Sequence, residues 1–258
     1  NSFRNILKIL CFHLWFKLDF VLNLKLIKRN IFMAYFPLFI NIENKPCLVA
    51  GGGKVAMRKA RVLLDFGAQV FIIAPVIEKE IKRMKEITVM EREFLLEDIA
   101  DKALVVAATD DAAENHRIAE LCKERGILVN AVDRIEDCSF IFPAYVKQKD
   151  VVAAFSSSGK SPVLTQYLKA QEYEILTGQI GCLNDLLGSL RSRVKQLLST
   201  EEERKCFYQE LLKLGLEKES LPTEREVEAL LTRYQISKMA DRKEGKKENG
   251  SHQKIKEQ

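Results

Sequence analysis

Histidine, tryptophan and closely spaced cysteines are scarce in this sequence. Its 258 residues include 3 histidines, 1 tryptophan and 6 cysteines, and no two cysteines form a C-x-x-C pair. The ligand spacings of zinc fingers and zinc ribbons are therefore missing, and we expect no metal ligands. Several cysteines lie inside apolar runs, where cysteine behaves as a small hydrophobic residue. This usage predicts a reducing, cytoplasmic compartment.

Long apolar segments are also lacking. Residues 1–32 are apolar and basic, but charged residues interrupt them before any stretch reaches the length of a membrane span. No small-residue cleavage site follows, so a secretory signal fits poorly. We expect 1–32 to be an extension outside the fold, with Met33 as the natural start, and no stable membrane insertion. A helix on the membrane surface is the alternative.

A strong charge of one sign is absent as well. The formal net charge is only +5, and much of it comes from the ends of the chain. Residues 238–258 are rich in Lys and Glu with almost no apolar residue, which predicts a disordered tail. Because that tail carries both signs, we expect no nucleic-acid partner.

What the sequence does contain, from Lys45 onward, is an alternation of short apolar runs and amphipathic segments. Helical spacing is clearest from Lys54 to Phe66, and Gly67 follows at the position that ends helices. The predicted strands are 47–50, 70–74, 88–94, 104–108 and 127–132; the predicted helices are 54–66, 78–86 and one from Asp110 or Asp111 to Arg125. Such alternation predicts an α/β fold with a doubly wound parallel sheet, a Rossmann-type domain.

The second half of the chain changes character. Two further β runs, Phe140–Val146 and Val151–Phe155, are joined by a polar segment and predict a hairpin. Ser161 and Pro162 then suit the N-cap and first position of a helix. The pattern stays helical to about residue 235, with a break at Glu217–Thr223.

A glycine turn carries the first chemical signal. Gly51, Gly53 and Ala56 form G-x-G-x-x-A between the first predicted strand and helix, where the backbone can approach a pyrophosphate. The alternative is a merely tight turn. An acid that would bind a ribose is missing at the end of the second strand, where Glu78 is the nearest, but no Arg is present for a 2′-phosphate either. We therefore expect NAD as the cofactor.

Two polar residues follow later strands. Thr109 directly follows the fourth predicted strand and Asp133 directly follows the fifth, on the edge where open α/β sheets bind ligands. Thr109 is placed to contact the nicotinamide side of a cofactor, or to cap the next helix. Asp133 is placed to accept a proton, or is an ordinary turn residue.

The serine-rich segment Ser156–Pro162 includes Gly159-Lys160-Ser161, which suggests a P-loop. That pattern requires glycine at position 154, where the chain has Ala154. The turn could still hold an anionic group through backbone N–H groups, or be an ordinary capped loop.

Together these motifs resemble the precorrin-2 dehydrogenase/sirohydrochlorin ferrochelatase family, including the corresponding part of siroheme synthases. The matching stretches occur in family order: Tyr35–Phe39, Gly51–Ala60, Ala107–Asp111, Asn130–Asp133, Ser139–Ala144 and Ser156–Leu164. Beyond residue 170 the resemblance is only to a helical region of similar size.

The resemblance implies NAD-dependent oxidation of precorrin-2 to sirohydrochlorin, with insertion of ferrous iron in some members. It implies a homodimer and these regions: 33–145 a Rossmann NAD-binding domain, 146–178 a small α+β dimerisation and substrate region, and 179–237 a helical C-terminal domain. The carried-over site residues are Lys54, Val55, Pro75 and Val76 for NAD, Asp133 for catalysis, and Ser157 near the tetrapyrrole. Lys54, Arg58 and Lys160 are candidates for the substrate's carboxylates.

Several alternatives stay open from the sequence. A dehydrogenase alone competes with a bifunctional dehydrogenase and chelatase. A non-catalytic NAD-sensing module would need the glycine turn but neither Asp133 nor the Ser156–Pro162 loop. A tetrapyrrole-delivery protein would not need the glycine turn. No methyltransferase domain follows in this chain, so we expect another protein to make precorrin-2.

Overall fold

The computed structural model describes residues 35–132, 134–218 and 220–236. The chain divides between Phe142 and Pro143 into two compact units, each described here by itself. The expected extension at 1–32, the expected tail at 238–258 and Asp133 lie outside the described residues.

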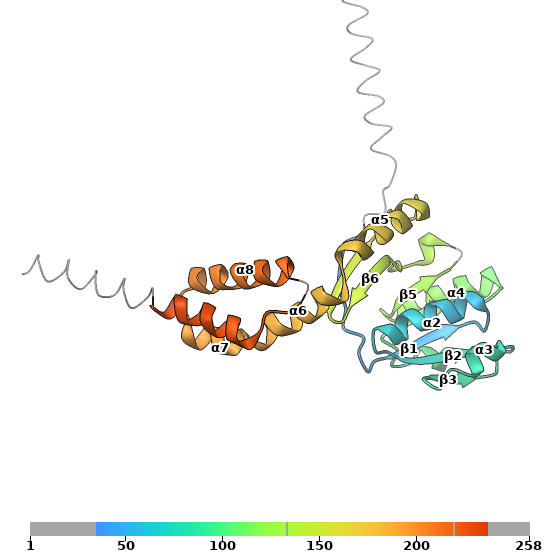
Figure 1. Cartoon of the computed structure of the whole chain (residues 1–258). Helices are drawn as coiled ribbons and strands as arrows, with labels where there is room; N and C mark the ends of the chain where they lie inside the picture. Colours follow the sequence, from blue (N-terminus) through green and yellow to red (C-terminus); the bar gives the residue numbers. More distant parts are fainter. Residues whose placement is uncertain (1–34, 133, 219, 237–258) are drawn as a thin grey trace, which may run out of the picture. The chain divides into compact units, whose positions relative to one another are not determined.

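Unit 1 is built on a five-stranded parallel sheet with the order β3-β2-β1-β4-β5 (Figure 1). Its elements are β1 (Pro46–Ala50), α2 (Lys54–Asp65), β2 (Gln69–Ile73), α3 (Lys79–Lys82), β3 (Ile87–Met90), the 3-10 turn η1 (Leu96–Ile99), β4 (Leu104–Ala107), α4 (Ala112–Glu124), β5 (Leu128–Ala131) and the 3-10 turn η2 (Ile135–Asp137). The chain adds β2 and β3 on one side of β1 and then adds β4 and β5 on its other side. The boundary between β1 and β4 is therefore the topological switch point, where such sheets bind ligands. The expected α/β class is confirmed.

The two faces of this sheet carry separate cores, because successive residues of a strand point to opposite sides. Cys47 and Val49 of β1 pack with α2 and α3 on one face. Leu48 and Ala50 pack with α4 and η1 on the other. All four strand residues are fully buried, which explains why the strands read as continuous apolar runs.

Three predicted elements differ from the structure by several residues. The expected helix 78–86 is only the single turn α3, held by the buried Ile81. The expected strand 88–94 ends at Met90, where the N–H of Arg92 bonds back to the carbonyl of Met90. The expected strand 140–146 begins after Pro143 instead, because proline has no N–H to donate to a ladder.

Unit 2 begins with an antiparallel hairpin and continues as helices. Its elements are β6 (Ala144–Gln148), β7 (Val151–Phe155), α5 (Pro162–Ile175), α6 (Gly178–Ser189), α7 (Arg191–Leu197), α8 (Glu201–Glu217) and a helical stretch over 224–236. The hairpin turns at Lys149, whose φ of 54° lies in the left-handed region. The predicted caps of α5, Ser161 and Pro162, are confirmed.

The helices of unit 2 bury an apolar core of their own. It consists of Val194, Leu198, Phe207, Leu211, Val227 and Leu231. The break predicted at Glu217–Thr223 lies between α8 and the helical stretch 224–236. Of the helices that the structure describes, none combines the length and apolar character needed to span a bilayer.

Candidate functional site

Three loops meet at the carboxyl-terminal edge of the sheet in unit 1. The Gly51 N–H donates to the carbonyl of Ile73 at 2.8 Å, and the N–H of Glu78 donates to the carbonyl of Gly52 at 2.9 Å. These bonds join the loop after β1 to the loop after β2. Ala108, the residue directly after β4, donates its N–H to the carbonyl of Ala50 at 2.7 Å. The predicted ligand-binding edge is therefore a connected surface.

The glycines of the turn serve two different purposes, close packing of the backbone and space for a ligand. A Cβ at Gly51 would lie 2.1 Å from the carbonyl oxygen of Ala108, and one at Gly52 would lie 2.1 Å from that of Val76. Gly51 also has a φ of +132°, which other residues rarely adopt. A Cβ at Gly53, by contrast, would meet none of the described atoms within 4 Å. Gly51 and Gly52 allow close packing, whereas Gly53 leaves space for a ligand.

The N-terminus of α2 opens into that space. Gly53 is the N-cap and provides no side-chain hydrogen bond, and the first turn carries no acidic residue. The first backbone N–H groups of a helix need acceptors, and the helix dipole favours an anion there. Ala56 is fully buried, which allows the close packing of helix on strand that this fingerprint requires. The turn therefore fits the pyrophosphate of a dinucleotide.

The remaining predicted cofactor contacts lie on the same edge. Lys54 and Val55 are the first residues of α2 and are exposed. Pro75 and Val76 follow β2, and Val76 is 81% exposed. The structure thus brings these residues together with the glycine turn, and their contacts with a cofactor remain predictions.

Thr109 is bonded into the start of α4. Its hydroxyl lies 2.8 Å from Oδ1 of Asn115 and 3.0 Å from the carbonyl of Asp111. Its backbone N–H donates to the same Oδ1 at 2.9 Å, and its carbonyl accepts from Nδ2 of Asn115 at 3.1 Å. The helix cap itself is Asp111, which accepts from Ala113. A structural role is therefore established for Thr109, and nicotinamide contact stays a prediction.

Asn115 is a residue that the sequence analysis missed. Its side chain is buried, and it is one of three buried polar residues among those described in the chain. It determines the path of the backbone at Thr109. The signal that could have indicated it is an amide on the apolar face of α4, where a polar group needs a local partner.

Asp133 lies outside the described residues, but the backbone that leads to it does not. β5 ends at Ala131, and the Val132 N–H donates to the carbonyl of Ala107 at 3.0 Å. The chain therefore leaves β5 beside the end of β4, on the same edge as the glycine turn. The catalytic role of Asp133 remains a prediction.

The predicted substrate residues Ser157 and Lys160 belong to unit 2, in the turn between β7 and α5. The Ser157 hydroxyl accepts from the N–H of Ser161 at 2.9 Å, and its carbonyl accepts from the N–H of Lys160 at 3.1 Å. Ser158 and Gly159 both have positive φ, at 53° and 78°. These bonds give the turn a defined shape, while its contact with a substrate remains a prediction.

Lys59, one turn further along α2, has an unusual environment. Burial lowers the pKa of its ammonium to about 8, and the neighbouring Arg58 guanidinium acts in the same direction. Its Nζ lies 3.9 Å from the centroid of the Phe142 ring, a cation–π contact. Burial raises the pKa of the Cys47 and Cys122 thiols to about 11, so neither is a reactive thiolate.

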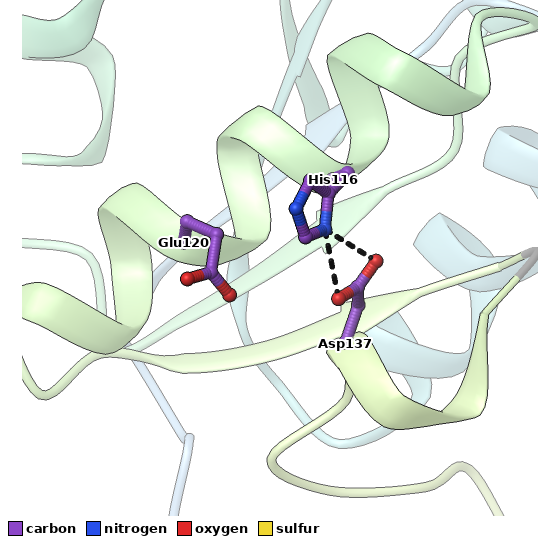
Figure 2. Close-up of side chains that lie close together, drawn as sticks. All are labelled: His116, Glu120 and Asp137. Atoms are coloured by element: carbon purple, nitrogen blue, oxygen red, sulfur yellow. Dashed lines mark hydrogen bonds and ion pairs between the residues drawn. The ribbon is translucent and has the colours of Figure 1, made fainter.

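A cluster of possible metal ligands lies between α4 and η2. His116, Glu120 and Asp137 each offer one ligand atom, and these atoms lie within 4.8 Å of one another. Figure 2 shows His116 and Glu120 projecting from α4 toward Asp137. Spacing along the sequence did not reveal this set, because Asp137 comes from a different element. The part of the set that the sequence could have indicated is the pair His116 and Glu120, which lie four residues apart and therefore on one helix face.

Comparisons with known proteins agree with this geometry. Residues 38–144 match the family described as putative NAD(P)-binding. Siroheme synthase of Ruthia magnifica is 38% identical over 180 residues, covering 69% of this chain and 38% of that protein. Siroheme synthase of Nitrosospira multiformis is 40% identical over 189 residues, covering 70% of this chain and 40% of that protein. The chain spans about two fifths of the length of these relatives.

A solved structure shares the fold. The precorrin-2 dehydrogenase SirC superposes with a TM-score of 0.57 at 21% identity, covering 78% of this chain and 98% of that one. At this identity the likeness concerns the fold, and it includes both the parallel sheet and the helices that follow. Residues 38–144 thus form an NAD(P)-binding domain, and over about 70% of its length the chain is related in sequence to part of the siroheme synthases.

Proposed function

We propose that this protein oxidises precorrin-2 to sirohydrochlorin with NAD⁺ in siroheme biosynthesis. The observation that carries the proposal is the open space at Gly53, in front of the uncapped N-terminus of α2. The matching relatives are named siroheme synthases, and the structural neighbour is a precorrin-2 dehydrogenase. A dinucleotide site in a chain with such relatives supports a dehydrogenase of this pathway.

NAD⁺ supplies the hydride acceptor when it is bound. The backbone N–H groups at the start of α2 would hold its pyrophosphate, with Lys54 and Val55 beside it. Pro75 and Val76 would line the ribose side, where the exposed surface offers apolar contact. No arginine stands in the loop from Ala74 to Glu78 to bind a 2′-phosphate, which favours NAD over NADP.

A side chain of the protein would accept the proton that the oxidation releases. Oxidation removes a hydride and a proton from precorrin-2, and the carboxylate of Asp133 would accept the proton. Thr109, oriented by Asn115, would contact the nicotinamide side of the cofactor. The cationic side chain of Lys160 and the turn at Ser157 would meet carboxylates of the tetrapyrrole.

A second activity is favoured by the name that the relatives carry. The relatives are named siroheme synthases, and siroheme is the iron complex of sirohydrochlorin. Iron would enter as a substrate, and a chelatase needs a base for the pyrrole protons rather than a fixed set of metal ligands. Asp133 would serve as that base.

The homodimer expected from the resemblance is supported by the surface of α5. None of the residues of α5 is buried, although the helix packs on β6 and β7. Its exposed side chains include Val163 at 81%, Tyr167 at 59% and Ile175 at 67%. Exposed apolar side chains gathered on one helix are typical of protein interfaces. We propose that it pairs with a second copy of the chain.

The compartment is proposed from the cysteines. Cys47, Cys122, Cys138, Cys182 and Cys206 are free thiols. Unpaired cysteines are usual in reducing compartments, which supports the cytoplasmic location expected from the sequence.

The decisive experiment mixes the purified chain with enzymatically generated precorrin-2 and follows the absorption spectrum with and without NAD⁺. Sirohydrochlorin should appear only with NAD⁺. A second arm supplies sirohydrochlorin and Fe²⁺ or Co²⁺ without NAD⁺ and tests chelation separately. A folded, NAD-binding protein that converts no precorrin-2 would contradict the proposal and favour an NAD-sensing module. A protein that binds the tetrapyrrole but not NAD would favour delivery.

A further inference from the structure

The His116, Glu120 and Asp137 cluster combines an imidazole with two carboxylates. His116 and Glu120 are one helical turn apart on α4, and Asp137 is the last residue of η2. Nδ1 of His116 lies 2.9 Å from both carboxylate oxygens of Asp137 (Figure 2). The side chain of Asp137 is only 4% exposed, whereas that of His116 is 45% exposed. A buried carboxylate thus faces a solvent-accessible imidazole.

Positively charged side chains already converge on the same carboxylates. The Lys123 ammonium lies 3.0 Å from Glu120 and 3.7 Å from Asp137. Nε of Arg134 lies 3.5 Å from Asp137 and 3.3 Å from Glu136. A buried carboxylate requires compensation of its charge. The position between Glu120 and Asp137 is therefore one that a cation occupies in this structure, namely the Lys123 ammonium.

Hydrogen bonds and buried side chains fix the position of α4, which carries two of the three residues of the cluster. Asp111 caps α4, and Asn115, adjacent to His116, is bonded to the backbone at Thr109. The opposite face of α4 is anchored by Ile118, Ala119 and Cys122, all fully buried. A site on such a frame needs only side-chain rotation to close. Ligand atoms sit about 2.1 Å from a bound transition ion. The half-exposed Glu120 side chain would rotate toward such an ion on leaving its ion pair with Lys123.

We propose that His116, Glu120 and Asp137 form a binding site for a divalent first-row transition ion such as Fe²⁺, Co²⁺ or Zn²⁺. Imidazole suits these ions, whereas Mg²⁺ and Ca²⁺ prefer oxygen ligands throughout. Three protein ligands leave coordination positions for water. The ion would displace the Lys123 ammonium from the carboxylates. The site departs from the sequence-based expectation of no metal ligands, and it does not rest on the proposed dehydrogenase activity.

The test titrates the purified full chain with Co²⁺ at neutral pH under a non-coordinating reductant and follows visible absorption. We expect one Co²⁺ per chain, with the weak bands of nitrogen and oxygen ligands and no strong thiolate band in the near ultraviolet. His116→Gln should weaken binding by at least about tenfold. Glu120→Gln should also weaken Co²⁺ binding. This substitution is at an exposed side chain and leaves the buried Asp137 in place.

Two further variants make the result specific. Lys123→Met should tighten Co²⁺ binding severalfold, because it removes the competing ammonium. The double variant His13→Gln/His252→Gln removes the other two histidines of the chain and should leave binding unchanged. Thermal unfolding of each variant without metal checks that it is folded.

Three outcomes would overturn the site. They are the absence of stoichiometric Co²⁺ binding by the unaltered chain, equal binding by a folded His116→Gln variant, or loss of binding in the double variant. Dehydrogenase turnover with NAD⁺ is measured in parallel and reports on the proposed function independently.

Discussion

At the scale of single residues, substitutions in the glycine turn distinguish the glycine needed for packing from the glycine needed for ligand binding. Gly51→Ala would place a Cβ 2.1 Å from the Ala108 carbonyl oxygen at a φ of +132°. We expect it to lower the free energy of unfolding by at least about 2 kcal/mol, from backbone strain and overpacking together.

Gly53→Ala is the matched substitution. Its Cβ would meet none of the atoms in the described part of the chain within 4 Å, and the φ of Gly53 is −95°, which alanine adopts readily. We expect unchanged stability but roughly tenfold weaker NAD⁺ binding, equivalent to about 1.4 kcal/mol. Urea unfolding and titration calorimetry measure the two quantities. Equal NAD⁺ affinity in Gly53→Ala would remove the pyrophosphate from this turn.

Asp133 carries the chemical step in the proposed mechanism. Asp133→Asn keeps the size of the side chain but removes the group that accepts a proton. We expect turnover of precorrin-2 to fall by about 10²- to 10⁴-fold, the usual contribution of a general base, while NAD⁺ binding stays unchanged. Steady-state absorption assays and calorimetry distinguish the two. Turnover equal to that of the unaltered protein would assign Asp133 to the turn alone.

At this scale, the sequence predicted those residues whose role depends only on their neighbours along the chain. The sequence pattern was enough to indicate Gly51, Gly53 and Ala56, because a strand followed by a glycine turn and a helix has few solutions. Asn115 was not predicted, because the need for an amide there comes from the backbone path at Thr109. His116 and Asp137 were missed for a related reason, since their contact joins α4 to η2.

At the scale of elements, α4 depends on one cap. The sequence left Asp110 and Asp111 as equal candidates, and the structure selects Asp111, which accepts from the N–H groups of Ala113 at 2.8 Å and Glu114 at 3.4 Å. We expect Asp111→Ala to lower the free energy of unfolding by about 1 kcal/mol. The neighbouring Asp110→Ala should change it by less than about 0.5 kcal/mol. Thermal unfolding compares them, and an Asp111→Ala variant as stable as the unaltered chain would show that Asp111 does not stabilise the helix.

Elements were predicted best where two signals coincide. For α2 and α5, helical spacing agrees with Gly67 after the first and with Ser161 and Pro162 before the second. For α3 and β3, only the residue pattern was present, and both are shorter than expected. Their ends depend on loop hydrogen bonds, such as that from Arg92 to the carbonyl of Met90, which a local pattern does not encode.

At the scale of the whole molecule, pairing through α5 is open to a direct test. Light scattering after size exclusion should give twice the chain mass of 29.5 kDa. Tyr167→Glu places a charge on the exposed apolar face and should produce monomers, whereas Ser192→Glu, on the exposed surface of α7, should not. A monomeric mass for the unaltered chain at every concentration would exclude the proposed homodimer.

The stability of unit 1 should also depend on pH through Lys59. Its pKa falls from 10.5 to about 8 on folding, so the unfolded chain binds more protons between these values and stability rises with pH there. Below about pH 8 the full cost of partly burying the ammonium applies. Because the residue is partly exposed, we expect Lys59→Met to stabilise the protein by only about 1 kcal/mol at pH 7.

That gain should shrink as the pH rises toward 10.5, where the native lysine is neutral in the folded protein and loses its charge in the unfolded chain as well. Urea unfolding at the two pH values measures the difference. Lys85→Met, an exposed substitution in the loop before β3, controls for loss of a surface charge. A gain independent of pH would show that Lys59 packing, and not its ionisation, is responsible.

The sequence by itself determined the class of the fold, the glycine turn and the resemblance to a family, because each is encoded by short motifs of neighbouring residues. Hydrophobic period, turn residues and caps act over a few positions and can be read without knowing the tertiary contacts. Only the tertiary structure decided which glycine faces open space, which acid caps α4, and that His116 meets a buried Asp137. Those features arise where strands and helices distant in sequence approach one another, so their free energies depend on packing that no local pattern contains.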